Sequence, residues 1–276
     1  GQVARELARR CPEGIAMTAL GRDDADLTLP ETCAEAIAIH APDLVINAAA
    51  YTAVDHAEQD EITATLVNAE APAAMAEICA ERTIPFVHVS TDYVFDGTGT
   101  RPFTPDDRPA PLGVYGRSKW AGEEAVRVAA GPHAILRTSW VFSAHGANFV
   151  KTMLRLSETR DHLRVVADQI GGPTPAAAIA DALWALGASL RDAGPSGTYH
   201  FAGGPAVSWA DFARAILAGA DRAVTVEDIP TSAYPTPASR PANSRLDGTT
   251  LLRDHAIAQP DWQTGLAAVL TELAEE

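Results

Sequence analysis

Residues 85–92 read PFVHVSTD, an apolar run that ends in two hydroxyl residues and a carboxylate. Apart from His88, residues 85–89 are apolar, which is typical of a strand buried on both faces of a parallel sheet. Similar runs and helical patterns alternate with it along the chain, as strands at 44–46 and 134–141 and helices at 31–39, 69–82 and 115–130. Strands that alternate with helices in this way predict a doubly wound α/β fold with a parallel sheet.

The same alternation continues toward both ends of the chain. The further elements that we expect are a strand at 15–20 (IAMTAL), a helix at 148–159, a strand at 163–167, a helix at 175–190, a strand at 198–202 and a helix at 209–218. Four prolines make residues 229–245 irregular, and two short helices end the chain. The pattern therefore predicts a Rossmann domain in residues 1–168, with further sheet elements from 176–202, and a smaller C-terminal lobe in 203–276.

The charge and the cysteines exclude several classes of protein. Among 276 residues, 36 are acidic and 21 are basic, which gives a formal net charge of −15. A surface this negative repels phosphate backbones and anionic lipid, so we expect neither nucleic acid nor a membrane as a partner. The three cysteines form no CxxC pair and leave one over, which is typical of a reducing cytoplasm rather than of a disulfide framework.

The chain opens with Gly1 and Gln2, directly ahead of a helical pattern. In a doubly wound sheet, a glycine-rich turn between the first strand and the first helix holds the pyrophosphate of a dinucleotide. We interpret Gly1 as the last glycine of such a turn, although a glycine before a helix is also common by itself. On this interpretation roughly a dozen residues, a strand of ~5–6 and its turn, precede Gly1, and the sheet is unstable without them.

Arg22 stands about 20 residues further on, where dinucleotide-binding folds distinguish a ribose hydroxyl from a 2′-phosphate. A guanidinium suits the 2′-phosphate, whereas an acidic side chain bonds the 2′-hydroxyl. Asp23 and Asp24 are adjacent to Arg22. The pattern therefore favours NADPH and leaves NADH open.

Tyr115 and Lys119 stand four residues apart on a predicted helix, which places them on one face. An ammonium close to a phenol lowers the pKa of the phenol from about 10, and such a tyrosine can give a proton to a carbonyl oxygen. A surface pair explains most instances of this spacing. The chain has only two lysines, Lys119 and Lys151, which gives the position of Lys119 more weight.

Small and polar residues follow the two predicted strands at 44–46 and 85–90. Thr91 and Asp92 come after the second strand, where the ends of parallel strands face a ligand crevice. Ala48, Ala49 and Ala50 come after the first strand, where short side chains let a cofactor lie against the backbone. Helix capping explains the first group equally well, and tight packing explains the second.

Six segments together resemble one enzyme family, in chain order and over nearly the whole chain. They are VINAAAYTAVDHAE (45–58), VSTDYVFDG (89–97), VYGRSKWAGE (114–123), LRTSWVF (136–142), DQIGGPT (168–174) and RPANSRLD (240–247). The family is that of the dTDP-4-dehydrorhamnose reductases, a branch of the extended short-chain dehydrogenase/reductase superfamily. The tyrosine–lysine spacing is common to the superfamily, whereas STDYVFDG, RTSW and RPxNSxLD are specific to this branch.

The resemblance implies an NADPH-dependent reduction of the 4-keto group of dTDP-4-dehydro-6-deoxy-L-mannose to dTDP-L-rhamnose. Tyr115 is then the general acid, Lys119 binds the nicotinamide ribose and tunes Tyr115, and Thr91 steadies the keto oxygen. The residues implied for the cofactor are Gly1, Gln2, Arg22, Asp26, Leu27, Ala48, Ala49, Ala50, Thr52, Tyr115 and Lys119. Those implied for the sugar nucleotide are Thr91, Asp92, Tyr93, Trp140, Arg240 and Asn243.

Other functions stay open at this point. Some relatives of this family are noncatalytic and act as a regulatory subunit of methionine adenosyltransferase, and others reduce or epimerise different nucleotide sugars. Arg240 can also be an ordinary solvated arginine. Some reductases of the family are magnesium-dependent dimers through acidic residues; we match no such acids here, so we expect no metal and leave a homodimer open. Residues 240–247 and the intact Thr91, Tyr115 and Lys119 favour the reductase.

Overall fold

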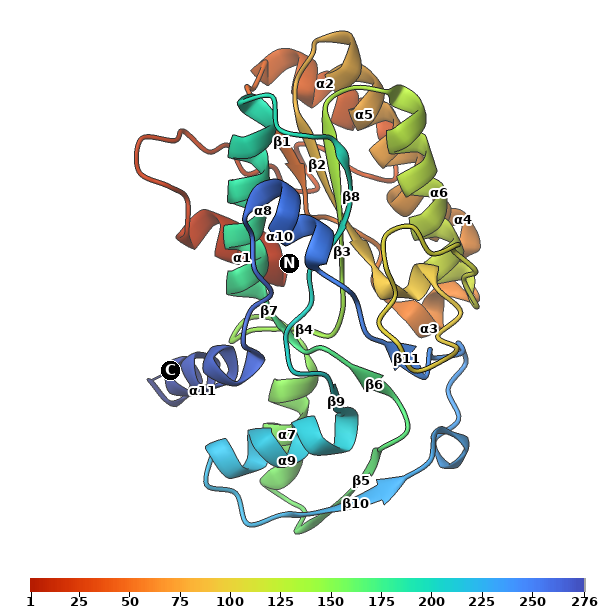
Figure 1. The fold of residues 1–276 in the computed structure, drawn as a ribbon, viewed down its shortest axis with the longest axis vertical. Helices are drawn as coiled ribbons and strands as arrows, with labels where there is room; N and C mark the ends of the chain where they lie inside the picture. Colours follow the sequence, from red (N-terminus) through yellow and green to blue (C-terminus); the bar gives the residue numbers. More distant parts are fainter. Residues whose placement is uncertain (276) are drawn as a thin grey trace.

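A computed structural model describes residues 1–275 of the chain. Its main sheet contains four parallel strands, namely β1 (Val45–Asn47), β2 (Phe86–Thr91), β3 (His133–Thr138) and β8 (Gly197–His200). They lie in the order β1-β2-β3-β8, and Phe86 of β2 lies opposite Val45 on one side and His133 on the other (Figure 1). The predicted doubly wound parallel sheet is therefore confirmed.

Two layers of helices cover this sheet, one on each face (Figure 1). One layer consists of α2 (Pro30–His40), α5 (Ala71–Glu81) and α6 (Val114–Ala129), and the other of α1 (Gln2–Arg9), α8 (Ala176–Arg191) and α10 (Thr249–His255). Side chains of a strand alternate between its faces. Accordingly, Phe86 belongs to a buried cluster with residues of α2, α5 and α6, while its neighbour Val87 belongs to another with residues of α1 and α8. Both positions are buried, as expected for a strand that is covered on both faces.

A second apolar cluster lies below the sheet in Figure 1. It is built from α7 (Phe149–Ser157), β5 (His162–Val166), α9 (Trp209–Gly219), β10 (Thr225–Ile229) and α11 (Trp262–Glu275). Strands β5 and β10 pair in parallel over their full length. The cluster thus draws elements from both sides of residue 168, and we propose it as the core of the smaller lobe.

Short elements connect the sheet to this second cluster. Strand β4 (Val141–Phe142) pairs with β7 (Thr174–Pro175), and β6 (Ile170–Gly171) lies between β9 (Val207–Ser208) and β11 (Asn243–Ser244). The remaining turns of helix are α3 (Val54–Ala57), α4 (Glu61–Thr65), the π-helix η1 (Leu66–Glu70) and the 3₁₀-helices η2 (Asp92–Val94) and η3 (Thr231–Ala233). Between β10 and β11, the proline-rich segment contains only η3, in agreement with the expected irregular structure.

The strand expected at 15–20 is not formed. These residues belong to the loop between α1 and α2 (Figure 1). The side chains of Ile15 and Leu20 are both exposed. A strand requires a neighbour that takes up its backbone hydrogen bonds, and no strand within residues 1–275 pairs with this segment. The prediction was wrong because an apolar run indicates burial without indicating a partner.

Across residues 1–275, none of the helices combines the length and apolar character that a bilayer crossing demands.

Candidate active site

The candidate site begins where β2 ends and α6 starts. Strand β2 ends at Thr91 and continues directly into η2, while the backbone N–H of Val114, at the start of α6, donates to Glu58 Oε1 at 2.8 Å. This bond ties the first turn of α6 to the segment that follows β1. Tyr115 lies on that turn, and its ring meets the Tyr93 ring edge-on with 5.4 Å between centroids. The predicted site residues on β2 and α6 are thus brought together.

Tyr115 is half-buried, and its acidity differs from what the sequence predicts. Burial raises the pKa of its phenol to about 12, a hydrogen bond with Thr91 opposes the rise, and the charge of Asp92 adds to it. We expected Lys119 to lower this pKa, and that expectation is wrong for this structure. The spacing places both residues on one face of α6, but the Lys119 ammonium turns away to other partners.

Lys119 is fully buried behind the end of β2. Its Nζ donates to the Val89 carbonyl oxygen at 2.8 Å and lies 3.2 Å from His88 Nε2. Burial lowers the pKa of Lys119 to about 8, and the nearby Glu123 carboxylate opposes that shift. The amine therefore titrates close to neutral pH, where a change of its charge can affect catalysis.

His88 links Lys119 to the end of β1, a connection that the sequence analysis missed. Its Nδ1 lies 3.2 Å from Asn47 Nδ2, and the Ala49 N–H donates to Asn47 Oδ1 at 3.0 Å, which turns the amide nitrogen toward His88. A neutral imidazole accepts only one hydrogen bond. When Nδ1 accepts from Asn47, Nε2 carries the hydrogen. That N–H can donate to Lys119 only when the Lys119 amine is uncharged. Burial, followed by the charge of Lys119, holds the pKa of His88 well below its usual value.

Thr91 and Asp92 form a tight pair beside Tyr115. The Thr91 hydroxyl donates to Asp92 Oδ1 at 3.0 Å and accepts the Tyr93 N–H at 3.2 Å. Asp92 is 3% exposed, and no hydrogen bond of normal geometry reaches its Oδ2. Burial raises the pKa of Asp92 to about 6, although hydrogen bonds with Ser244, Thr91 and the backbone N–H groups of Asp92 and Tyr93 favour the charged form. Thr91 caps η2, as the capping alternative predicts, whereas capping does not explain the burial of the Asp92 carboxyl.

Asn68 is a second residue that sequence reasoning missed. It lies in the π-helix η1, a type of helical turn that often occurs at functional sites. Its amide receives the Tyr51 N–H at 2.8 Å and donates to the Tyr51 carbonyl at 3.1 Å and to the Ser118 hydroxyl at 3.0 Å. A Cβ on Gly122 would overlap the Asn68 carbonyl oxygen, so the glycine permits close contact with α6. Asn68 thereby fixes the segment after β1 against the helix that carries Tyr115.

The residues implied for the cofactor lie in three places. Gly1 caps α1, and the Gln2 side chain accepts hydrogen bonds from Ser143, which follows β4, and from Asn148, which caps α7. Ala48, Ala49, Ala50 and Thr52 follow β1, and Tyr51 within this run packs in the same cluster as Tyr115. Arg22, Asp26 and Leu27 lie in the loop before α2, where Arg22 is largely exposed and lies 4.0 Å from Asp26.

The residues implied for the sugar nucleotide are held by the C-terminal half of the chain. The Trp140 ring stacks on Trp209 with 3.6 Å between centroids. Arg240 forms an ion pair with Asp55 of α3 at 2.7 Å. Asn243 is buried, and its amide donates to the Arg101 carbonyl at 2.8 Å, which gives it a part in fixing the loop after η2.

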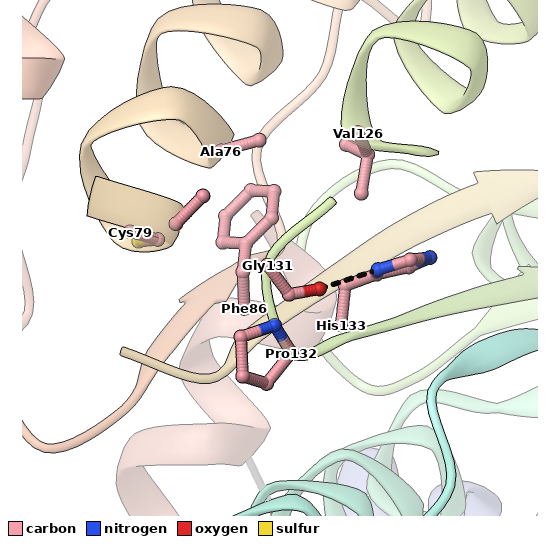
Figure 2. A pocket seen from close by; sticks show the side chains of 8 residues that line it. Ala76, Cys79, Phe86, Val126, Gly131, Pro132 and His133 are labelled. Atoms are coloured by element: carbon pink, nitrogen blue, oxygen red, sulfur yellow. Dashed lines mark hydrogen bonds between the residues drawn. The ribbon is translucent and has the colours of Figure 1, made fainter. Parts of the chain in front are cut away.

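One hollow in the structure lies away from these residues (Figure 2). It is lined by Ala76, Cys79, Ala80, Phe86, Val126, Gly131, Pro132 and His133. Phe86 begins β2 whereas Thr91 ends it, so the hollow lies at the opposite end of the strand from Tyr115. The only polar ring on its rim, His133, bonds the Gly131 carbonyl at 2.8 Å. The hollow is a packing feature without the convergent polar groups of a binding site.

Within residues 1–275, no group of three or more histidine, cysteine, aspartate or glutamate side chains is arranged to hold a metal ion.

Comparisons with known proteins agree on one family. A family model described as the RmlD substrate binding domain matches residues 1–275. A dTDP-4-dehydrorhamnose reductase from Sinorhizobium fredii is 44% identical over 270 residues, which covers 95% of this chain and 91% of the relative.

Solved structures give the same result. The crystal structure of a dTDP-4-dehydrorhamnose reductase from Clostridium acetobutylicum matches with a TM-score of 0.94 and 32% identity over 99% of this chain and 96% of the other. A dTDP-4-dehydrorhamnose reductase from Bacillus anthracis, solved in complex with NADP, matches with a TM-score of 0.93 and 33% identity over the same shares of the two chains.

Proposed function

The chain belongs to the dTDP-4-dehydrorhamnose reductase family, and from that membership we propose that it reduces the 4-keto group of dTDP-4-dehydro-6-deoxy-L-mannose with NADPH, giving dTDP-L-rhamnose. The observation that supports the proposal is that Thr91 and Tyr115 lie together where β2 ends and α6 begins, with the buried Lys119 one turn further along α6. A noncatalytic relative would not need this set of a proton donor, a hydroxyl and a buried amine.

The residues after β1 and before α2 fit a dinucleotide. Ala48, Ala49 and Ala50 have side chains short enough to let a ring lie against the backbone, and the exposed guanidinium of Arg22 suits a 2′-phosphate. Gly1 and Gln2, at the start of α1, stand where such folds hold a pyrophosphate. When bound, NADPH supplies the hydride that adds to C4 of the sugar.

The chain supplies the proton for the keto oxygen. Because the pKa of Tyr115 is raised to about 12, its hydroxyl carries a proton at neutral pH and can donate it as a general acid. The O–H bond of Tyr115 breaks as the new O–H bond of the alcohol forms, which leaves a phenolate. Lys119 lies one turn further along the same helix and can stabilise that negative charge when it is protonated. Thr91 completes the group as a second hydrogen-bonding hydroxyl.

The sugar nucleotide is proposed to lie between η2 and the segment that carries Arg240. The Arg240 guanidinium, currently paired with Asp55, is the cation on this side that suits a diphosphate. Trp140 and Tyr93 offer flat rings to the base or the sugar. The resemblance implies Asp92 and Asn243 for the sugar nucleotide as well, and both side chains are buried.

The cysteines and the net charge bear on where the protein acts and on what it binds. Cys11, Cys33 and Cys79 are free thiols, which supports a cytoplasmic location. A dTDP-sugar is the expected small-molecule partner. We keep a homodimer as an open prediction and, given the net charge of −15, expect no nucleic-acid partner.

A substrate panel tests the proposal. Purified protein should oxidise NADPH, followed by the loss of nicotinamide absorbance, with dTDP-4-dehydro-6-deoxy-L-mannose and not with its UDP or GDP counterparts. Comparing NADPH with NADH at matched concentrations tests the assignment of Arg22. Absence of turnover from folded protein, or equal rates with all nucleotide sugars, would contradict the proposed reaction.

A further inference from the structure

The Thr91 hydroxyl has one hydrogen and more than one acceptor within reach. In the structure this hydrogen points to Asp92 Oδ1 at 3.0 Å, while the Tyr93 N–H occupies a lone pair of the same oxygen at 3.2 Å. Tyr115 interacts with the same hydroxyl from α6. As long as the Asp92 carboxylate holds the hydrogen, Thr91 has none to give to a keto oxygen.

Asp92 itself is poorly compensated for a charged group. It is 3% exposed, its Oδ2 has no hydrogen bond of normal geometry, and no ion pair joins it to a cation in the described part of the chain. The groups that face it are Ser244 from β11, Tyr115 from α6, its neighbours Thr91 and Tyr93, and the backbone N–H groups of Asp92 and Tyr93. None of these is a cation, so the site favours an uncharged carboxyl far more than water does.

We propose that Asp92 is a positioning residue that turns the Thr91 hydroxyl, and that its uncharged form directs the Thr91 hydrogen toward the keto oxygen of the substrate. When Asp92 carries a proton, its O–H donates to Thr91 Oγ1, and the Thr91 O–H becomes a donor beside Tyr115. No bond to carbon forms or breaks, and the Asp92 proton stays on the carboxyl. This role differs from the direct substrate contact that the sequence resemblance implies for Asp92, and it rests on the proposed reductase function.

The direction of the pH effect follows from which form is active. Because the protonated form of Asp92 is required, kcat/KM falls as pH rises through the pKa of Asp92, which burial raises to about 6 in the free protein. Tyr115 and Lys119 lose their protons at higher pH, with pKa values of about 12 and 8, so the Asp92 transition is the first on the alkaline side.

Two variants of Asp92 test this role by the pH dependence of kcat/KM. Asp92→Asn cannot ionise, and its amide N–H can still donate to Thr91, so we expect kcat/KM within about threefold of the wild-type maximum and no transition near pH 6. Asp92→Leu can neither donate nor accept, and we expect kcat/KM to fall by roughly 10²-fold, as for the loss of one oriented donor. Asp96→Asn, which keeps the acceptor for the Thr98 turn, is the matched control and should retain the wild-type profile.

A double-variant cycle then shows whether Asp92 acts through Thr91. In a Thr91→Val background, Asp92→Leu should cause little further loss of kcat/KM, because no hydroxyl remains to be turned. An equal loss in both backgrounds, or an unchanged transition near pH 6 in Asp92→Asn, would overturn the proposal.

An infrared titration makes the test independent of turnover. The carboxylic acid band that is present in wild type and absent in Asp92→Asn should appear as pH falls from 8 to 5, with a midpoint near 6. If Asp92 is still charged at pH 5, the positioning role is wrong even when the reductase activity is correct. If instead the band appears but no nucleotide sugar is reduced, the proposed reaction is wrong, although Asp92 is shown to take up a proton.

Discussion

Helix α6 carries two buried ionisable groups one turn apart, Lys119 and Glu123, and their surroundings differ. Glu123 receives two hydrogen bonds from Arg137, at 2.9 and 2.6 Å, and others from Ser90 and Arg127, each at 2.6 Å. Burial alone would raise the pKa of Glu123, but the hydrogen bonds and charge of Arg137, with help from Ser90 and Arg127, hold it below its usual range. Lys119 has only a carbonyl oxygen and an imidazole as partners.

The difference distinguishes charged groups that stabilise this fold from ionisable groups that can take part in its chemistry. The Arg137 guanidinium also lies over the Phe95 ring, 5.0 Å from its centroid, so an aromatic face holds it in addition to the Glu123 carboxylate. Around Tyr115, by contrast, Lys119 titrates near 8 and Asp92 near 6, because the burial of each group is not matched by an opposite charge. Fully compensated burial stabilises the fold, whereas incompletely compensated burial leaves groups able to change their charge.

The largest expected effect concerns the compensated pair. Glu123→Gln leaves the Arg137 guanidinium buried without its counter-charge, and we expect the free energy of unfolding in urea to fall by about 3–5 kcal/mol. The double variant Glu123→Leu with Arg137→Met removes both charges and should recover most of that loss. A single-variant loss below about 1 kcal/mol would show that the pair is not structural and would remove the contrast with Lys119.

At Tyr115 we expect a large loss of activity with little loss of stability, the reverse of the result expected at Glu123. Tyr115→Phe removes the proton donor but keeps the ring that packs against Tyr93, so kcat should fall by roughly 10²-fold or more. The free energy of unfolding should change by less than about 1 kcal/mol, since a half-buried hydroxyl is removed without a cavity. Steady-state kinetics and urea unfolding of the same preparation measure both values. A near-normal kcat would exclude Tyr115 as the general acid.

The smallest effects are expected at Arg240 and Asp55, a pair that is neither fully buried nor free. Arg240→Met should raise the KM for the nucleotide sugar by about tenfold, as for the loss of one charged hydrogen bond, with little change in kcat. Asp55→Asn keeps the acceptor for the Ala238 N–H but releases the guanidinium, so KM should fall, by roughly threefold. Both variants should unfold within about 1 kcal/mol of wild type. Equal KM values in wild type and both variants would show that Arg240 does not bind the substrate.

Local patterns predicted the parts of this molecule whose cause is local. The strands β2 and β3 follow from runs that are mostly apolar, and Tyr115 and Lys119 are on one face of α6 as their spacing requires. Spacing along a helix does not determine where the end of a long side chain points, so the contact of Lys119 with His88 was not predicted. The strand predicted at 15–20 failed for a similar reason. Whether a segment forms a strand depends on a distant segment that pairs with it, which the local sequence does not show.

Two of the unpredicted residues differ in what the sequence could have revealed. Arg137 interrupts the apolar run 134–141, and a cation inside a buried strand demands a buried partner, which could have directed attention to Glu123. Asn68 gave no such signal. Its role depends on a π-helical turn and on the close contact that Gly122 allows, and neither is visible as a pattern of residue types.

The stacked indoles of Trp140 and Trp209 have a further use. Trp140 follows β3 of the main sheet and Trp209 begins α9 of the second cluster, and their rings are nearly parallel, at 11° and 3.6 Å between centroids. Indoles in such contact share electronic excitation, so their absorption and circular dichroism differ from those of separate tryptophans. A ligand that moves the smaller lobe against the sheet has to slide or part these rings. A change in the absorption or circular dichroism of the two tryptophans would therefore report movement of the smaller lobe in unlabelled protein.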